Sequence, residues 1–101
     1  MEDYQCTAAD LAADPREKLV IDLRSRAFYD RGTWPGAVSM PMDDPDGPPA
    51  LTDKTLPVYL ICYTGMTADD YALQLRLDGF EAHSVLDGWR GCLLYLLQQE
   101  Q

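Results

Sequence analysis

Residues 56–79 read LPVYLICYTGMTADDYALQLRLDG and decide the fold class. The apolar, β-branched run in this stretch ends at Cys62, a short loop with Gly65 follows, and Thr67 is expected to open an amphipathic helix that ends before Gly79. Backbone N–H groups at a helix N-terminus favour negative charge, so this order puts a thiol where a thiolate is stabilised. A cysteine at the end of a buried strand is usually only a small core residue. Here the order of strand, loop and helix favours a nucleophile at Cys62.

The loop after Cys62 predicts a ring of backbone amides around the sulfur. Five consecutive residues are expected to form this ring and to contact the substrate: Tyr63, Thr64, Gly65, Met66 and Thr67. Gly65 permits the positive φ that closes such a turn. Two side-chain roles stay open. The Thr67 hydroxyl either donates to the sulfur or caps the helix, and Tyr63 either lines the pocket or packs on the surface.

Short apolar runs alternate with helical patterns along the rest of the chain. Strands are expected at 19–23, 37–40, 57–61 and 82–86, and helices at about 7–13, 26–31, 67–77 and 89–98. The first helix has Thr7 as its N-cap and Asp10 at N3, and Ser25 can cap the second. The alternation predicts an α/β fold with a mostly parallel sheet, helices on both faces, and functional loops at the C-terminal ends of the strands.

Composition limits both the size and the partners of the protein. A chain of 101 residues fits one domain, spanning 1–101, and 47% hydrophobic with 25% charged residues is ordinary for a globular protein. The net charge of −9 argues against nucleic acid and against anionic membrane surfaces as partners. No run approaches the roughly 20 apolar residues of a spanning helix, and the first residues lack a signal-peptide pattern. The chain is therefore expected to be cytoplasmic.

The cysteines and the single histidine predict neither a metal centre nor a cofactor. Cys6, Cys62 and Cys92 are odd in number and widely spaced, which suggests neither a disulfide framework nor a zinc site. His83 cannot build a metal cluster alone, and its place in an expected strand favours a structural or surface role. Cys92 falls within the last expected helix, where a small buried residue fits.

Five segments, in the same order along the chain, resemble the rhodanese-like family in its single-domain form. They are VIDLR (20–24), DRGTWPGAV (30–38), YLICYTGMT (59–67), DGF (78–80) and VLDG (85–88). The resemblance implies a small five-stranded α/β domain in which Cys62 carries a persulfide. It also implies transfer of a sulfane sulfur from a small donor or a persulfidated protein to a thiol or another nucleophile. Arg24 ends a neighbouring strand, where it either reaches the loop as a substrate contact or forms a salt bridge to a helix.

Several departures from the family pattern leave the sulfur donor open. The loop after Cys62 has no basic residue, unlike that of many thiosulfate-using members. Thr33 and Trp34 stand where a histidine is often seen, and Gly88 is followed by Trp89 rather than by a second glycine. The segment 43–55 is too rich in proline for the helix often found there.

Two other functions compete with sulfur transfer. Phosphatases and arsenate reductases of related fold use a Cys-x5-Arg loop, but Ala68 stands where that arginine would be, and no guanidinium is left to grip a dianion. The second alternative is a non-enzymatic interaction or regulatory module in which Cys62 is inert. The intact Cys62 argues against it, and the lack of loop cations argues for it.

Two aspartates at the start of the helix after Cys62 have two interpretations. Asp69 and Asp70 favour the helix through its N-terminal dipole. If they also face the sulfur, they oppose anionic donors, and thiosulfate is a poor substrate compared with a less charged or protein-bound donor. If they point away from the pocket, they stabilise the helix alone and leave donor preference unchanged.

Overall fold

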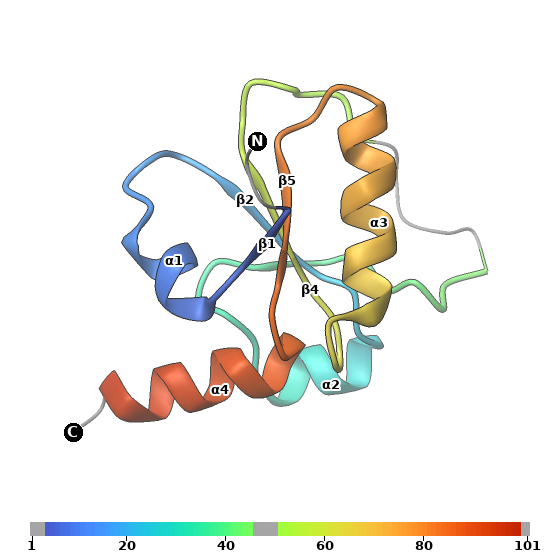
Figure 1. Cartoon of the computed structure of the whole chain (residues 1–101). Coiled ribbons are helices and arrows are strands. Elements are labelled where there is room, and N and C mark those ends of the chain that lie inside the picture. Colours follow the sequence, from blue (N-terminus) through green and yellow to red (C-terminus); the bar gives the residue numbers. More distant parts are fainter. Residues whose placement is uncertain (1–3, 46–50, 100–101) are drawn as a thin grey trace.

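The computed structural model describes residues 4–45 and 51–99. A parallel sheet of five strands lies at its centre, in the order β1-β5-β4-β2-β3 (Figure 1). The strands are β1 (Gln5–Cys6), β2 (Leu19–Asp22), β3 (Val38–Ser39), β4 (Val58–Ile61) and β5 (Ala82–Val85). The helices are α1 (Ala8–Ala13), α2 (Arg26–Arg31), α3 (Met66–Leu77) and α4 (Gly88–Gln99). The predicted α/β fold with a five-stranded sheet is confirmed.

Helices cover both faces of the sheet, and β4 is therefore buried on both sides. Val58 and Leu60 face a core cluster that includes the apolar stripe of α3, whereas Tyr59 and Ile61 face a second cluster built from α1 and α4. This alternation follows from the two-residue period of a strand, and full burial on both sides explains why β4 is a continuous apolar run. Figure 1 shows α3 on one side of the sheet and α1 on the other.

The register of the central strands aligns their C-terminal ends. Asp22, the last residue of β2, pairs with Ile61 at the end of β4 and with Ser39 at the end of β3. The backbone N–H of Leu23 donates to the Ile61 carbonyl at 2.7 Å, so Leu23 and Cys62 leave the sheet side by side. The segments that follow β2, β3 and β4 therefore meet at the C-terminal end of the sheet.

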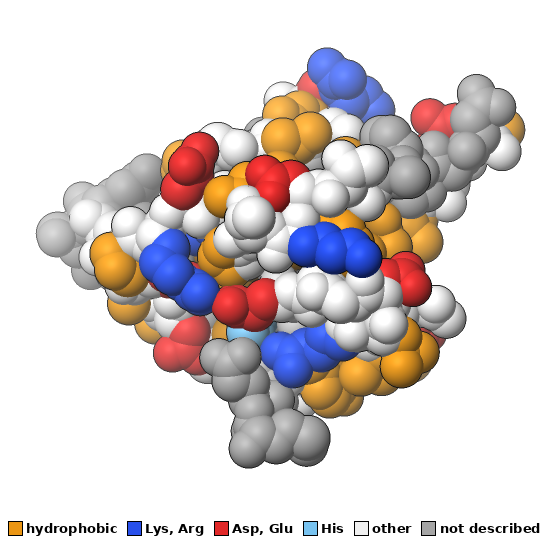
Figure 2. All heavy atoms as spheres, turned by 90° about the horizontal axis from the view of Figure 1, so that it is seen from above, with side chains coloured by type: hydrophobic (Ala, Val, Ile, Leu, Met, Phe, Trp, Pro, Cys, Tyr) orange, Lys and Arg blue, Asp and Glu red, His pale blue; other side chains and the backbone are white. Residues whose placement is uncertain are grey.

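The opposite end of the sheet, where β2 and β5 begin, carries a network of charged side chains. Arg16 bridges Asp14 and Glu81, and the Glu81 carboxylate also lies 2.9 Å from Nε2 of His83, whose ring stacks on Tyr59. The Arg16 guanidinium lowers the pKa of Glu81 to about 2. Figure 2 shows this end of the molecule, where basic and acidic side chains are interspersed around the histidine. His83 thus has the structural role that its strand position predicts.

Some boundaries differ from those expected from sequence. The two-residue strand β1 was not predicted, and α3 begins at Met66 with Gly65 as its N-cap, so the interpretation of Thr67 as the N-cap is wrong. The capping box of Thr7 and Asp10 is confirmed, with both hydrogen bonds at 3.0 Å, but the Ser25 side chain makes no capping bond to α2.

The segment 43–55, predicted to be too rich in proline for a helix, falls partly outside the described residues, and in its described parts it contains no helix. One domain over 1–101 stays a prediction. In the part of the chain that the structure describes, no helix is long and apolar enough to span a membrane.

Candidate active site

Cys62 is placed by β4 and held by the start of α4. It follows the last residue of β4, a strand buried at every position, and is only 3% exposed. Its carbonyl accepts a hydrogen bond of 2.7 Å from the backbone N–H of Trp89. Gly88, at φ +53°, makes this approach possible, because a Cβ there would lie 2.3 Å from the Cys62 carbonyl oxygen. The single glycine before Trp89 therefore allows α4 to pack against the loop that follows Cys62.

Two backbone N–H groups donate to the Cys62 sulfur. The donor at Gly65 lies 3.0 Å from Sγ and the donor at Ala68 lies 3.4 Å from it. The Gly65 donor fits the predicted ring, but Ala68 lies one residue beyond the predicted range. Because α3 begins at Met66, the N–H of Ala68 has no carbonyl one turn earlier to bond and is free to point at the sulfur. Locating the helix start one residue earlier would have identified this donor.

Gly65 closes the loop in the left-handed conformation, as the sequence predicts. Its φ is +101° and its ψ is −19°, and an added Cβ would meet only ordinary contacts, the nearest being the Val85 carbonyl oxygen at 3.5 Å. A side chain at this position is therefore opposed by backbone strain rather than by collision.

Replacing Gly65 with valine is expected to cost about 1–3 kcal/mol of stability and to slow alkylation of Cys62 at neutral pH. The strain is relieved by moving the Gly65 amide away from the sulfur, which removes one of its donors. Gly36→Ala is the matched control, because Gly36 also has a positive φ (+84°) and open space around it. It should lose stability and leave the Cys62 alkylation rate unchanged. Equal alkylation rates in both variants would show that Gly65 does not shape the loop.

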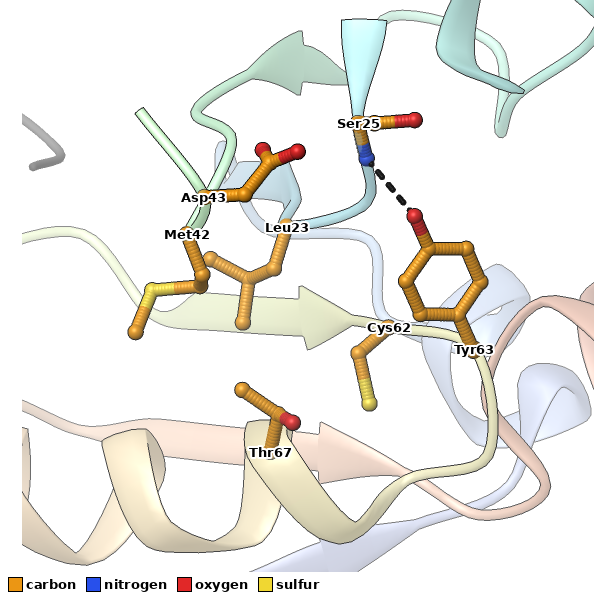
Figure 3. Close-up of a pocket in the computed structure, with 7 residues that line it drawn as sticks. All are labelled: Leu23, Ser25, Met42, Asp43, Cys62, Tyr63 and Thr67. Atoms are coloured by element: carbon orange, nitrogen blue, oxygen red, sulfur yellow. Dashed lines mark hydrogen bonds between the residues drawn. The ribbon is translucent and has the colours of Figure 1, made fainter. Parts of the chain in front are cut away.

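A small cavity of about 110 Å³ opens above the sulfur. Seven residues line it: Leu23, Ser25, Met42, Asp43, Cys62, Tyr63 and Thr67 (Figure 3). Of the residues predicted to contact substrate, Tyr63 and Thr67 belong to this lining, whereas Thr64 and the 76% exposed Met66 do not. Such a volume admits a sulfur atom with a short chain behind it, not a bulky group.

Tyr63 forms one wall of the cavity while remaining half exposed. Its hydroxyl oxygen accepts a hydrogen bond of 3.0 Å from the Ser25 backbone N–H, and its ring packs edge-on against Phe28 at 5.4 Å. Both interpretations of Tyr63 therefore hold at once: it lines the pocket and packs on α2.

Arg24 lies outside the cavity, on the other face of the chain from Leu23. Its guanidinium pairs with Asp22 at 2.8 Å, donates to the Gly32 carbonyl at 2.6 Å, and lies 4.5 Å from the centre of the Trp89 ring. Successive residues of an extended chain point to opposite sides, so Leu23 takes the pocket side and Arg24 cannot. The structure thus gives Arg24 an ion pair, but the partner is Asp22 at the end of β2 and not a helix residue as one alternative had it. Thr33 also donates to Asp22, at 2.8 Å.

Asp69 faces the sheet rather than the sulfur. Its carboxylate accepts hydrogen bonds from the Ser84 hydroxyl on β5 and from the Gln5 amide on β1, the latter at 3.2 Å. Asp70 is exposed, and neither aspartate lines the cavity. The interpretation in which these carboxylates repel an anionic donor at the sulfur is therefore not supported for Asp69.

Replacing Asp69 with alanine is expected to cost about 1–2 kcal/mol of unfolding free energy, since the Ser84 hydroxyl and the Gln5 amide lose their shared acceptor. Asp70→Ala, one residue along on the exposed side of α3, should cost less. Urea denaturation compares the two. A larger loss for Asp70→Ala would contradict the assignment.

Four lining residues were not predicted as site residues: Leu23, Ser25, Met42 and Asp43. The first two follow β2, and the last two are brought in by the segment after β3, where the Met42 N–H donates to the Leu23 carbonyl at 3.1 Å. The available signal was the predicted parallel sheet itself, because the C-terminal ends of parallel strands deliver the residues that follow them to one place.

The other two cysteines are buried away from this cavity. Cys6 and Cys92 are free thiols, and burial raises the pKa of Cys92 to about 12. Among residues 4–45 and 51–99, no group of three or more metal-ligating side chains comes together.

Comparison with known proteins agrees with this arrangement. The family model for the rhodanese-like domain matches residues 7–91. The chain belongs to the rhodanese-like family. Its fold is that of a rhodanese-like domain protein from Staphylococcus aureus, with a TM-score of 0.74 and 23% identity over 89% of this chain and 91% of that one.

Two further relatives extend the comparison. A solved protein of Staphylococcus saprophyticus is 25% identical, with a TM-score of 0.70, over 85% of this rhodanese-like chain and 89% of its own. A protein named tRNA sulfurtransferase, from Desulfurococcus amylolyticus, is 39% identical over 74 residues. That match covers 73% of the rhodanese-like chain and 14% of the relative, so the chain spans only a small part of that protein's length.

Proposed function

We propose that this rhodanese-like chain is a sulfurtransferase that moves a sulfane sulfur through a persulfide on Cys62. One observation carries the proposal: the Cys62 sulfur ends a buried strand, receives two backbone N–H donors and faces a cavity of about 110 Å³. Membership of the family and the likeness to a protein named tRNA sulfurtransferase support the same chemistry.

The proposed reaction has two displacements at sulfur. The Cys62 thiolate attacks the outer sulfur of a donor R–S–SH, a new S–S bond forms at Cys62, and the donor's S–S bond breaks with its electron pair leaving on RS⁻. An acceptor thiolate then attacks the outer sulfur of the Cys62 persulfide, and Cys62 leaves as the thiolate. Both steps conserve charge, and no external oxidant is needed.

The two backbone N–H donors can stabilise the Cys62 thiolate at both displacements. Hydrogen bonds from Gly65 and Ala68 stabilise negative charge on Sγ before attack and again when Cys62 departs. The cavity gives the extra sulfur atom a place beside Thr67 and Leu23. No resident metal or cofactor enters either step.

The proposed partners are a small sulfane-sulfur donor or a persulfidated protein, and a thiol or other nucleophilic acceptor. The net charge of −9 disfavours direct contact with nucleic acid. A cytoplasmic location belongs to the proposal, because reducing conditions keep thiols such as these three free.

Turnover of a small-molecule persulfide in the presence of a thiol acceptor tests the proposal. We expect the protein to accelerate sulfur transfer catalytically and to carry a cyanide-labile sulfur when the acceptor is left out. A protein that neither gains this sulfur nor accelerates transfer is an interaction module, and the proposed enzymatic function would then be wrong.

A further inference from the structure

The charged side chain that lines the cavity is negative. Asp43 is the only carboxylate among the seven lining residues, and no lysine, arginine or histidine is among them. Within the described residues, no hydrogen bond or ion pair engages the Asp43 side chain. Figure 3 shows its carboxylate on the side of the cavity formed by Leu23 and Ser25.

Arg24, which lies between the lining residues Leu23 and Ser25 in the chain, is committed elsewhere. Arg24 is 2% exposed, and its guanidinium is held by Asp22 and the Gly32 carbonyl on the other face of the chain. An anionic donor entering the cavity therefore meets one carboxylate, no lining cation, and an overall charge of −9.

Building on the proposed sulfur transfer, we propose that Asp43 selects the sulfur donor by charge. The preferred donors are short persulfides that carry an ammonium group close to the sulfane sulfur, and the disfavoured donors are anionic, thiosulfate included. In one of the two interpretations of the sequence, Asp69 and Asp70 made thiosulfate a poor donor; in this proposal the effect comes from Asp43 instead.

The size and anchoring of the cavity support a short donor. Asp43 and Cys62 both line a cavity of about 110 Å³, so a short chain is enough to bring an ammonium group to Asp43 while its sulfur reaches Cys62. The hydrogen bond from the Met42 N–H to the Leu23 carbonyl, at 3.1 Å, fixes the backbone next to Asp43. The carboxylate is thus attached to an anchored segment at the cavity wall.

The chemical step is the first displacement already described, with a cationic donor. The Cys62 thiolate bonds to the outer sulfur of ⁺H₃N–R–S–SH, and the donor's S–S bond breaks to release the aminothiolate. The ammonium group takes no part in the bond changes and contributes through its attraction to Asp43.

Three persulfides of similar length test this selection: those of cysteamine, 2-mercaptoethanol and 3-mercaptopropionate, which carry a positive, neutral and negative group. Thiosulfate is the fourth donor. The measurement is the rate of sulfur loading on Cys62, followed by mass spectrometry at low and high salt. We expect the cysteamine persulfide to load fastest and the two anionic donors slowest, with the differences shrinking as salt screens them.

Asp43→Asn should reduce the ratio of cationic to anionic loading rates roughly tenfold, the scale of one unit charge close to the reacting group near a protein surface. Asp70→Asn is the matched control, since it changes the net charge equally from an exposed position outside the cavity. It should leave the ratio close to that of the unchanged protein.

The outcomes separate this inference from the proposed function. Loading of Cys62 with no charge preference, or an equal change of the ratio in both variants, would overturn the role of Asp43 and leave sulfur transfer intact. Failure of all four donors to load Cys62 would overturn the proposed function and this inference together.

Discussion

Replacing Cys62 with serine is expected to abolish sulfur loading and sulfur transfer while leaving the fold in place. The hydroxyl is close in size to the thiol, so the two backbone donors and the packing of β4 remain satisfied. A serine hydroxyl is not ionised at neutral pH and does not form a persulfide, so the loss should be complete rather than partial. Loading with a small persulfide, followed by cyanide treatment, measures it.

Two matched variants control for general loss of thiols. Cys6→Ser and Cys92→Ser remove the other two cysteines, which are buried outside the cavity. Since burial raises the pKa of Cys92 to about 12, that thiol is protonated at neutral pH and is not a competing nucleophile. Both variants should load sulfur at Cys62. A Cys62→Ser protein that still gained cyanide-labile sulfur would refute the mechanism.

Replacing Gly88 with alanine is expected to have the largest structural effect of any single methyl group added near the site. The new Cβ would lie 2.3 Å from the Cys62 carbonyl oxygen and 2.8 Å from the carbonyl carbon and oxygen of Tyr63. All three are backbone atoms, so the collision is relieved only by separating α4 from the loop. That separation breaks the bond from the Trp89 N–H to Cys62. We expect a loss of roughly 3 kcal/mol or more in unfolding free energy and a marked fall in sulfur loading.

Gly79→Ala is the control that separates collision from backbone strain. Gly79 also has a positive φ (+97°), but a Cβ there meets only the flexible Lys54 side chain, at 3.6 Å. Its stability loss should be about 1–2 kcal/mol, and sulfur loading should be unaffected. If Gly88→Ala proved no more destabilising than Gly79→Ala, the close approach of α4 to the Cys62 carbonyl would be wrong.

The features that could be predicted from the sequence are those that depend on residues close together in the chain. The apolar run of β4, the left-handed Gly65 and the capping box of α1 each follow from residues close together in sequence, and each is found in the structure. The same is true of Cys62 at the strand end, because the run before it, the glycine after it and the helix that follows all lie within one short stretch.

The parts that could not be predicted depend on contacts between distant segments. Strand β1 has only two residues, too few to show the alternation of side chains that is typical of a strand. It forms by pairing with β5. Asp43 reaches the cavity because the parallel register ends β2, β3 and β4 at one end of the sheet, which no local pattern in a proline-rich segment reveals. The orientation of Asp69 was likewise decided by partners elsewhere in the chain, Ser84 and Gln5.

Peptide mapping of the unaltered protein after exposure to a small-molecule persulfide shows which cysteine carries the transferred sulfur. We expect one additional sulfur atom, carried by the peptide that contains Cys62, removed by cyanide and passed on to an added thiol. Sulfur found on Cys6 or Cys92 instead, or no added sulfur on any peptide, would contradict this expectation.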